Sequence, residues 1–456
     1  MMSFEISWLR ARLSALTYAY VFAAALLAAY GLQLAEANDY AGYRLFSIDF
    51  RYLTGAMLSV FAVGVMMPTH VRRPSDFFFT LYGLFVVLPY ATLYPIRNDI
   101  ESAELIVGFS ILLFPLLSMR IVSAVVPKVR FPKLLKQQAI VWVIVLLCIG
   151  GLLHALANPP SSAGFDLATA YDRRIEGRSI FPAGTLSAYF NTAIVNGFAP
   201  FLAFIAGLRR QVLLMALAMF SGVAFFYLLG LKAPVFLSIL GLLIGITARR
   251  GQLNGIVRVI YFLIFGIFFV FFLEYSLFGF SLIGDYFVRR AFSVPPYIVS
   301  AYFEFISAPS TISWSLLEGL NSSEPIPFLV GESFLGVPGL NANTNAFLYQ
   351  FASGGLPTYG LTILLIATIF AVLDAAHKST QNPVLMYLGF SYGILLTEQA
   401  ATTALVSSGI GLLIALNLFS GAYPTYGLRV VSVKVRDSVS NALFRGRSGE
   451  CCWTDL

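Results

Sequence analysis

The sequence predicts an all-α, polytopic integral membrane protein with about twelve transmembrane helices. Of its 456 residues, 58% are hydrophobic and 11% are charged, and the mean hydropathy is +0.81. A water-soluble domain holds roughly half apolar and a quarter charged residues. The apolar segments recur at about 20 residues, the length that crosses a bilayer core of about 30 Å. No soluble domain stands apart, so residues 1–456 are expected to form a single membrane domain.

The expected spanning helices follow the apolar segments in order. The first segment lacks a small-residue cleavage site, which predicts a retained helix and not a signal peptide. The seventh and eighth are separated by the tight turn GLKAP, in which Gly230 and Pro234 flank Lys232. The expected helices are 13–34, 53–69, 77–95, 104–125, 137–157, 186–207, 211–230, 233–248, 255–277, 356–375, 383–400 and 403–422.

Basic residues predict the orientation of these helices, because cytoplasmic loops carry an excess of Lys and Arg. When the spans alternate, 20 of the 29 basic residues fall on one side. That side is expected to be cytoplasmic, together with both termini and a C-terminal tail, 423–456. The net charge of +7 therefore reflects topology and predicts no nucleic-acid partner. The basic residues on the other side are Arg44, Arg51, Arg97, Arg173, Arg174, Arg178, Lys232, Arg289 and Arg290.

Two connections on the expected outer side are much longer than the others. They are residues 158–185 and residues 279–355. Loops of this length are uncommon in a compact protein unless they are functional. We therefore expect the chemistry to lie on the outer face.

The first of these loops contains the arginine-rich stretch YDRRIEGR, residues 171–178. Helical spacing would place Arg174 and Arg178 on one face, with Asp172 and Glu176 nearly opposite. Arg173 adds a third cation. A guanidinium group is always charged, and its planar fork of donors matches phosphate oxygens.

The second loop carries another pair, Arg289 and Arg290, within GDYFVRRAFSVPPY. If the two clusters converge, they would clamp a pyrophosphate. The alternative is that these arginines pair with local acids or with lipid head groups. Lys232 would neutralise a phosphate, or it would simply cap its helix.

Aromatic side chains lie on both sides of Arg289 and Arg290, and amide side chains follow further along the chain. Tyr286, Tyr297 and Tyr302 offer apolar platforms for sugar rings, and Asn343 and Asn345 donate and accept hydrogen bonds as sugar hydroxyls require. The alternative is an interfacial aromatic belt followed by ordinary turn residues. Three cysteines and three histidines show no spacing of a metal site.

On these features the chain resembles bacterial O-antigen polymerases of the Wzy type, which are many-helix proteins with two enlarged, arginine-rich periplasmic loops. The resemblance rests on FFYLLGLKAPVFLSILGLLIG, GDYFVRRAFSVPPYIVSAYFEF and NANTNAFLYQFASGGLPTYG. A family pattern, Arg followed by ten residues and Gly, fits Arg173 to Gly184. It fails in the second loop, where Ser300 and Ala301 follow Arg289 and Arg290 at that distance.

The resemblance implies a metal-independent glycosyltransferase of the integral-membrane GT-C class in the bacterial inner membrane, without a cofactor. The growing glycan would leave undecaprenyl pyrophosphate and join a fresh lipid-linked repeat unit, in contact with membrane lipids and a chain-length regulator. The resemblance implies catalytic roles for Arg173, Arg178, Arg289 and Arg290, with Arg174 and Lys232 as further ligands and Asp172, Asp285 or Glu332 as base.

Two alternatives belong to other classes. An O-antigen ligase, which transfers glycan to lipid A core, shares this architecture but is expected to carry a histidine in the larger outer loop. Residues 279–355 contain none. A non-enzymatic flippase or transporter of lipid-linked glycans is expected to show repeat symmetry and charges at the bilayer midplane, and the sequence shows neither clearly.

Overall fold

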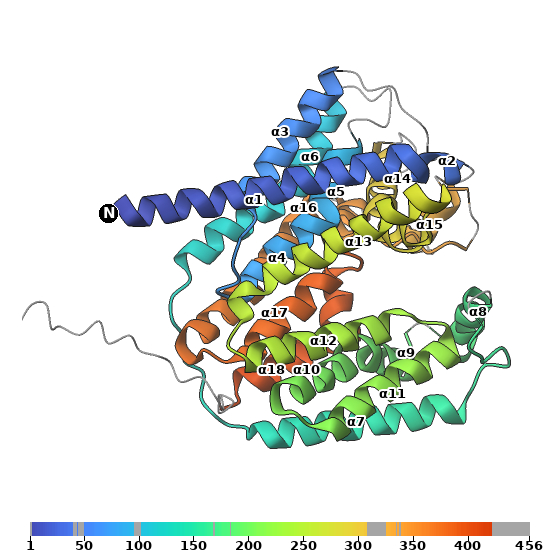
Figure 1. Cartoon of the computed structure of the whole chain (residues 1–456). Coiled ribbons are helices and arrows are strands. Elements are labelled where there is room, and N and C mark those ends of the chain that lie inside the picture. The colour runs from blue at the N-terminus through green and yellow to red at the C-terminus, as the bar shows by residue number, and fades with distance from the viewer. Residues whose placement is uncertain are drawn as a thin grey trace, which may run out of the picture.

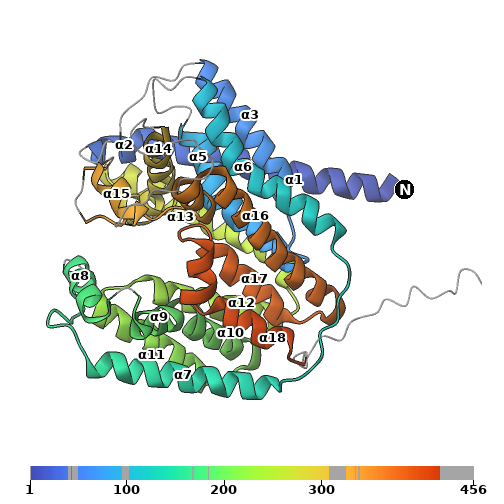
Figure 2. The ribbon, with the colours of Figure 1, turned by 180° about the vertical axis from the view of Figure 1, so that it is seen from behind.

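The computed structural model is a bundle of helices (Figures 1 and 2). It describes residues 2–39, 43, 50–94, 102–166, 169–182, 184–307, 325–333, 335–336 and 339–421. Within these ranges every regular element is a helix, and β pairing is limited to one isolated bridge between Leu135 and Ser420. The predicted all-α class is therefore confirmed.

Most of the helices follow the apolar segments of the sequence. In chain order they are α1 (Met2–Ala29), η1 (Tyr30–Leu34), α2 (Ala35–Ala37), α3 (Phe50–Met66), α4 (Pro74–Tyr82), η3 (Gly83–Val87), α5 (Leu88–Leu93), α6 (Ser102–Val125), α7 (Gln137–Ala157), α8 (Ala170–Ile180), α9 (Leu186–Ala193), η5 (Ile194–Phe198), α10 (Ala199–Arg209), α11 (Val212–Leu229), α12 (Ala233–Arg249), η6 (Leu253–Gly255), α13 (Ile256–Phe278), η7 (Gly284–Ser293), α14 (Val294–Ser307), α15 (Ile326–Ser333), α16 (Ala346–Thr380), α17 (Pro383–Leu395), η8 (Thr403–Ser407) and α18 (Ile410–Leu418).

In the described part of the chain, eight helical stretches are long and apolar enough to cross a membrane. They confirm a polytopic membrane protein, whereas the count of twelve and the orientation stay predictions. The long stretches are Arg12–Ala37, Pro74–Leu93, Ile106–Val125, Gln137–Ala157, Leu186–Arg209, Val212–Leu229, Leu253–Phe278 and Ala346–Thr380, and shorter apolar helices are Leu53–Met66, Ala233–Arg249 and Pro383–Leu395.

The last expected span, 403–422, differs from the prediction because it is divided. η8 ends at Ser407 and α18 begins at Ile410, and between them Gly409 has φ +69°, a conformation that glycine adopts readily. The break packs tightly against η5: a Cβ at Gly197 would lie 2.3 Å from the Ser408 carbonyl oxygen. The division therefore arises from a tertiary contact. The tail 423–456 lies outside the described residues.

Many of the basic residues predicted to be cytoplasmic do gather at one end of the bundle, where they bind backbone carbonyls near helix C-termini. Arg73 donates to the Ser123 carbonyl at 2.5 Å, and Lys378 donates to the Val126 carbonyl at 2.7 Å. The last carbonyls of a helix lack intrahelical partners and carry its negative dipole end. We call this the basic end. Similar bonds join Arg12 to Val65, Arg120 to Met66 and Arg249 to Gly207.

The opposite end, which we call the loop end, holds α8 from the first long loop and α15 from the second (Figure 1). The second loop does not lie wholly on the surface. The ring of Phe292, at the end of η7, contacts Phe22, Phe85 and Phe268 with centroid distances of 5.0 to 5.8 Å. These three residues lie near the middle of long apolar helices, so η7 reaches into the bundle.

A second part of this loop also folds back along the bundle. Phe78 packs against both Phe347 and Phe370, at 6.0 and 5.5 Å. In one straight helix these two residues would be about 35 Å apart. The chain instead turns at Gly354 and Gly355, whose backbone is not helical, so the first turns of α16 fold back beside the rest.

Candidate functional site

The arginine-rich stretch of the first long loop forms α8, as its spacing predicts. α8 packs on the turn between α11 and α12, and two glycines permit the contact. A Cβ at Gly230 would lie 2.3 Å from the Ala170 carbonyl oxygen, and a Cβ at Gly177 would lie 2.6 Å from Leu229. Gly230 also has φ +62°, in the left-handed region. Close approach here fixes the position of α8 relative to the bundle.

Glu176 ties the rest of this loop to α8. Its carboxylate accepts hydrogen bonds from the backbone N–H of Ser161 at 2.5 Å and of Ser162 at 3.0 Å, and from both serine hydroxyls. These bonds, led by that from the Ser162 hydroxyl, lower the pKa of Glu176 from 4.5 to about 2. Glu176 is therefore an anionic anchor and is not available to pair with the arginines.

Arg173 is fully buried, with 0% of its surface exposed. It donates to the Thr169 hydroxyl and to the Asp166 carbonyl, both at 2.8 Å, and its guanidinium carbon lies 5.7 Å from the Phe226 ring centre. The sequence predicts Arg173 as a catalytic cation, but these contacts enclose it within the loop. We therefore assign it to holding the loop against α11.

Arg174 and Arg178 project from α8 on the side expected from helical spacing. Arg174 donates from Nε and Nη2 to the Gly230 carbonyl at 3.3 and 3.1 Å and is half-buried. Arg178 is exposed, and its guanidinium carbon lies 5.5 Å from the centre of the Phe328 ring. Phe328 belongs to α15, so this cation–π contact joins the two long loops.

η7 positions the second pair of arginines. Arg289 forms an ion pair with Asp285, with Nε 2.8 Å from Oδ1, whereas Arg290 is exposed. Phe287 meets Phe236, on the first turn of α12, edge to face at 5.8 Å. η7 is thus held beside the α11–α12 turn, the same turn on which α8 packs.

The two arginine clusters converge at this place. Burial lowers the pKa of Arg174, the charge of Arg290 lowers it further, and the charge of Arg178 contributes less. An arginine from the second loop therefore affects Arg174 more strongly than its neighbour on the same helix does. Ion pairs in the described ranges are Arg73 with Asp76, and Arg289 with Asp285. The charges of Arg178 and Arg290 thus both act on Arg174, and none of the three forms an ion pair with an acid among the described residues.

The remaining predicted residues divide between this site and the core. Asn345 is buried and caps α16, because its Oδ1 accepts from the N–H groups of Phe347 and Leu348 at 3.2 and 3.1 Å. Tyr302 is buried and donates to the Ala342 carbonyl at 3.1 Å. Both side chains hold the second loop in place, so the structure does not offer them as sugar ligands.

The other predicted residues keep at least part of their side chains exposed. Tyr297 is partly buried and stacks on Tyr43 at 5.1 Å. Glu332 follows Phe328 by four residues and so lies on the same face of α15, next to the Arg178 contact. The exposed residues are Asp172, Lys232, Tyr286, Glu332 and Asn343.

Three positions of the candidate site were not predicted from the sequence. They are the anchor Glu176, the ring of Phe328 and the close contact at Gly230. The turn GLKAP was a sequence signal for Gly230. For Arg289, the ion pair with Asp285 confirms the alternative that these arginines pair with local acids. Phe328 had no sequence signal, because its partner is about 150 residues away.

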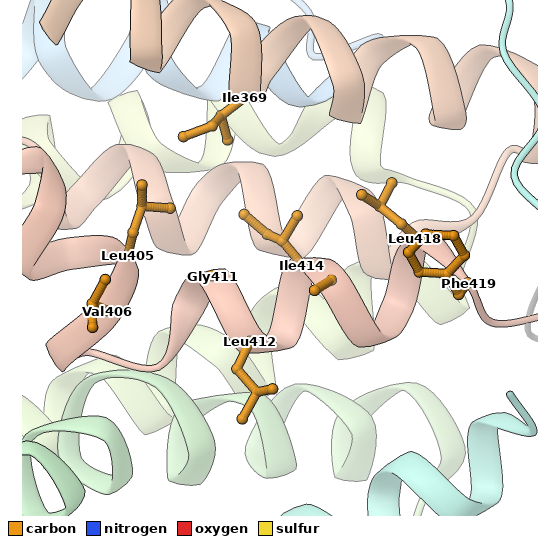
Figure 3. A pocket seen from close by; sticks show the side chains of 9 residues that line it. Ile369, Leu405, Val406, Gly411, Leu412, Ile414, Leu418 and Phe419 are labelled. Atoms are coloured by element: carbon orange, nitrogen blue, oxygen red, sulfur yellow. The ribbon is translucent and has the colours of Figure 1, made fainter. Parts of the chain in front are cut away.

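An apolar cavity of about 510 Å³ lies between α16 and α18 (Figure 3). Ile369 of α16 faces Leu405, Ile414 and Leu418 across it. All nine lining residues are apolar, so the cavity suits a hydrocarbon chain and offers nothing to a sugar.

Comparisons of the chain with protein-family models, with curated proteins and with solved structures return no match. Within the described ranges, no cluster of three His, Cys, Asp or Glu side chains could hold a metal ion. The cations that the protein itself brings to the loop end are arginine and lysine side chains.

Proposed function

We propose that this protein is a glycosyltransferase that polymerises lipid-linked oligosaccharide repeat units, as an O-antigen polymerase does. The loop end would face the periplasm of a bacterial inner membrane, with both termini in the cytoplasm. Donor and acceptor are glycans on undecaprenyl pyrophosphate, and a chain-length regulator is the expected protein partner.

The observation that carries the proposal is that Arg290 of the second loop and Arg178 of the first, about 110 residues apart, both act on the charge of Arg174, and none of the three forms an ion pair among the described residues. Like charges repel, so a protein gains nothing in stability by gathering them without acids. A polyvalent anion removes that repulsion. Guanidinium groups approaching from two sides fit the two phosphates of a diphosphate ester.

The chemistry follows from this placement. An acceptor sugar hydroxyl attacks the anomeric carbon of the donor glycan, the bond from that carbon to the diphosphate oxygen breaks, and the diphosphate leaves with the electron pair. Negative charge grows on the leaving oxygen during this step. Preorganised cations aimed at growing charge are often the largest catalytic contribution. We assign this role to Arg178 and Arg290, which are exposed, with Arg174 beside them.

The other residues take supporting parts. The ion pair with Asp285 orients Arg289, whereas the next residue, Arg290, forms no ion pair within the described ranges. The hydroxyl proton needs an acceptor, and Glu332 is the exposed acid on the α15 face that meets Arg178. Tyr286 and Asn343 are exposed and have the chemistry to contact sugars. The apolar cavity between α16 and α18 has the chemistry that an isoprenoid chain requires.

The proposal is tested with the purified protein, a lipid-linked repeat unit and a gel that resolves polymer length. Arg178→Ala and Arg290→Ala should each lower turnover about 100-fold, the effect of removing one preorganised donor. Arg→Lys should recover only part of it, because the fork geometry is lost. Arg250→Ala, at an exposed position of the basic end, is the matched control and should leave turnover unchanged.

A host that makes long O-antigen separates this function from its rivals. Deleting the gene should leave lipopolysaccharide capped by a single repeat. Bare core would instead indicate a ligase or a flippase. Normal polymer length with Arg178 and Arg290 both changed to alanine would refute the arginine mechanism.

A further inference from the structure

The chain between α6 and α7 forms an extended segment at the basic end, which we call the basic strap (residues 126–136). It runs along the edge of the molecule past the ends of α16 and α18 (Figure 2). Backbone bonds fix it to both helices: Val129 N–H donates to the Ala375 carbonyl at 3.3 Å, and Leu134 and Leu135 N–H donate to the Phe419 carbonyl at 2.9 and 3.0 Å. The strap is therefore a fixed surface.

Two side-chain contacts strengthen this attachment. The Ser379 hydroxyl donates to the Val129 carbonyl at 2.7 Å. The Phe131 ring meets the Phe419 ring edge to face at 5.9 Å. Phe131 thus points toward the bundle while its neighbours along the strap are exposed.

Four of those exposed neighbours are basic. Lys128, Arg130, Lys133 and Lys136 are exposed, and among the described residues none of them has a hydrogen-bond or ion-pair partner from its side chain. The strap contains no acid. Other basic residues of this end, such as Arg73 and Lys378, are instead occupied by helix carbonyls. The strap therefore presents uncompensated positive charge at fixed positions.

Apolar side chains alternate with these cations. Leu134 is 72% exposed, and Val129 and Leu135 are also exposed. The strap connects two helices long enough to span a membrane, and Trp142, on the second turn of α7, is 60% exposed. Exposed tryptophans collect at the membrane–water interface. These positions place the strap at the level of the lipid headgroups.

We propose that the basic strap binds the headgroups of anionic phospholipids, with Leu134 reaching into the acyl boundary between them. Lysines and arginines next to a membrane surface attract anionic lipid, and the attraction is screened by salt. A fixed backbone holds the four charges ready, so no ordering of the strap is needed. This binding is independent of the proposed transferase activity.

Quenching of Trp142 fluorescence by brominated lipids tests the proposal. The full chain carries four tryptophans, and Trp8, Trp314 and Trp453 are changed to Phe so that only Trp142 reports. Two kinds of vesicle are compared: one in which only phosphatidylglycerol is brominated, and one in which only phosphatidylcholine is brominated. From the quenching in each, the protein with an unchanged strap should show about a fivefold preference for the anionic lipid near Trp142. The preference should fall as NaCl is raised toward about 1 M.

Replacing Lys128, Arg130, Lys133 and Lys136 by Gln should bring this preference to about one, and Lys133→Gln with Lys136→Gln should lower it by about half. The matched control for the double variant, Arg72→Gln with Arg250→Gln, also removes two positive charges from exposed positions of the same end and should keep the preference. Equal quenching by both lipids in the wild type would overturn the proposal. A preference for anionic lipid that survives the four substitutions would also overturn it. In that case the charges of the strap would be available to an acidic protein partner instead.

Discussion

Changing Gly230 to alanine tests whether the close contact between α8 and the α11–α12 turn sets the arginine site. The new Cβ would lie 2.3 Å from the Ala170 carbonyl oxygen. Ordinary contacts begin near 3.4 Å, so α8 must move away by about 1 Å. That movement weakens the bond from Arg174 to the Gly230 carbonyl, now 3.1 Å long.

The size of the effect follows from these contacts. An L-residue in the left-handed conformation costs about 1 kcal/mol, and a hydrogen bond from a charged donor contributes about 1.5 kcal/mol at a half-buried site. Together they destabilise the docking of α8 by about 2–3 kcal/mol, equivalent to roughly 100-fold more frequent opening. A displacement of about 1 Å in a positioning element also costs about 100-fold in turnover.

Hydrogen exchange of residues 170–180 and polymer formation measure the two effects. Gly184→Ala is the matched control, because Gly184 has φ +87° in the same loop but has no atom within 4 Å of a built Cβ. Gly184→Ala should raise the frequency of opening of residues 170–180 only about fivefold, which is the part of the effect due to the left-handed backbone conformation alone. If Gly230→Ala behaves like Gly184→Ala in both assays, the contact with Ala170 does not position the arginines.

Three further predictions concern the loops. The hydrogen bonds to Glu176 lower the pKa of its carboxyl from 4.5 to about 2, so these bonds stabilise the first loop fully above pH 4.5. Protection of residues 158–166 from hydrogen exchange should therefore hold at neutral pH and fade as the pH drops from 4.5 toward 2. A loss of protection centred at neutral pH would contradict this. Asn345→Ala removes the cap of α16 and should cost about 1 kcal/mol in thermal melting, with Asn345→Ser losing less; equal melting of both would argue against a capping role. Glu332→Gln should lower kcat about 100-fold with unchanged donor affinity, and unaltered kcat would exclude Glu332 as the base.

The membrane-spanning helices were predictable because a run of about 20 apolar residues has few alternatives to a spanning helix. The division of 403–422 was not predicted, although Ser407, Ser408 and Gly409 interrupt its apolar run. What divides it is the fit of Ser408 against Gly197 and of Gly409 against Phe198, a contact between segments about 200 residues apart.

The candidate site was also predictable in part. Helical spacing predicts that Arg174 and Arg178 share a face of α8, and the structure forms that helix. Spacing gives no sign that Arg173 is buried, since its partners become available only when the loop folds over it. Asn345 was likewise predicted to be a sugar ligand, because the turn residues around it give no sign that a helix starts at the next residue.

The most direct test of the central claim is a structure of the protein bound to an oligosaccharide on undecaprenyl pyrophosphate. The diphosphate should lie within hydrogen-bond distance, about 3 Å, of both Arg178 and Arg290, with Arg174 beside it. A diphosphate bound elsewhere, or contacted by arginines of one loop alone, would contradict the claim that the two loops act on a single ligand.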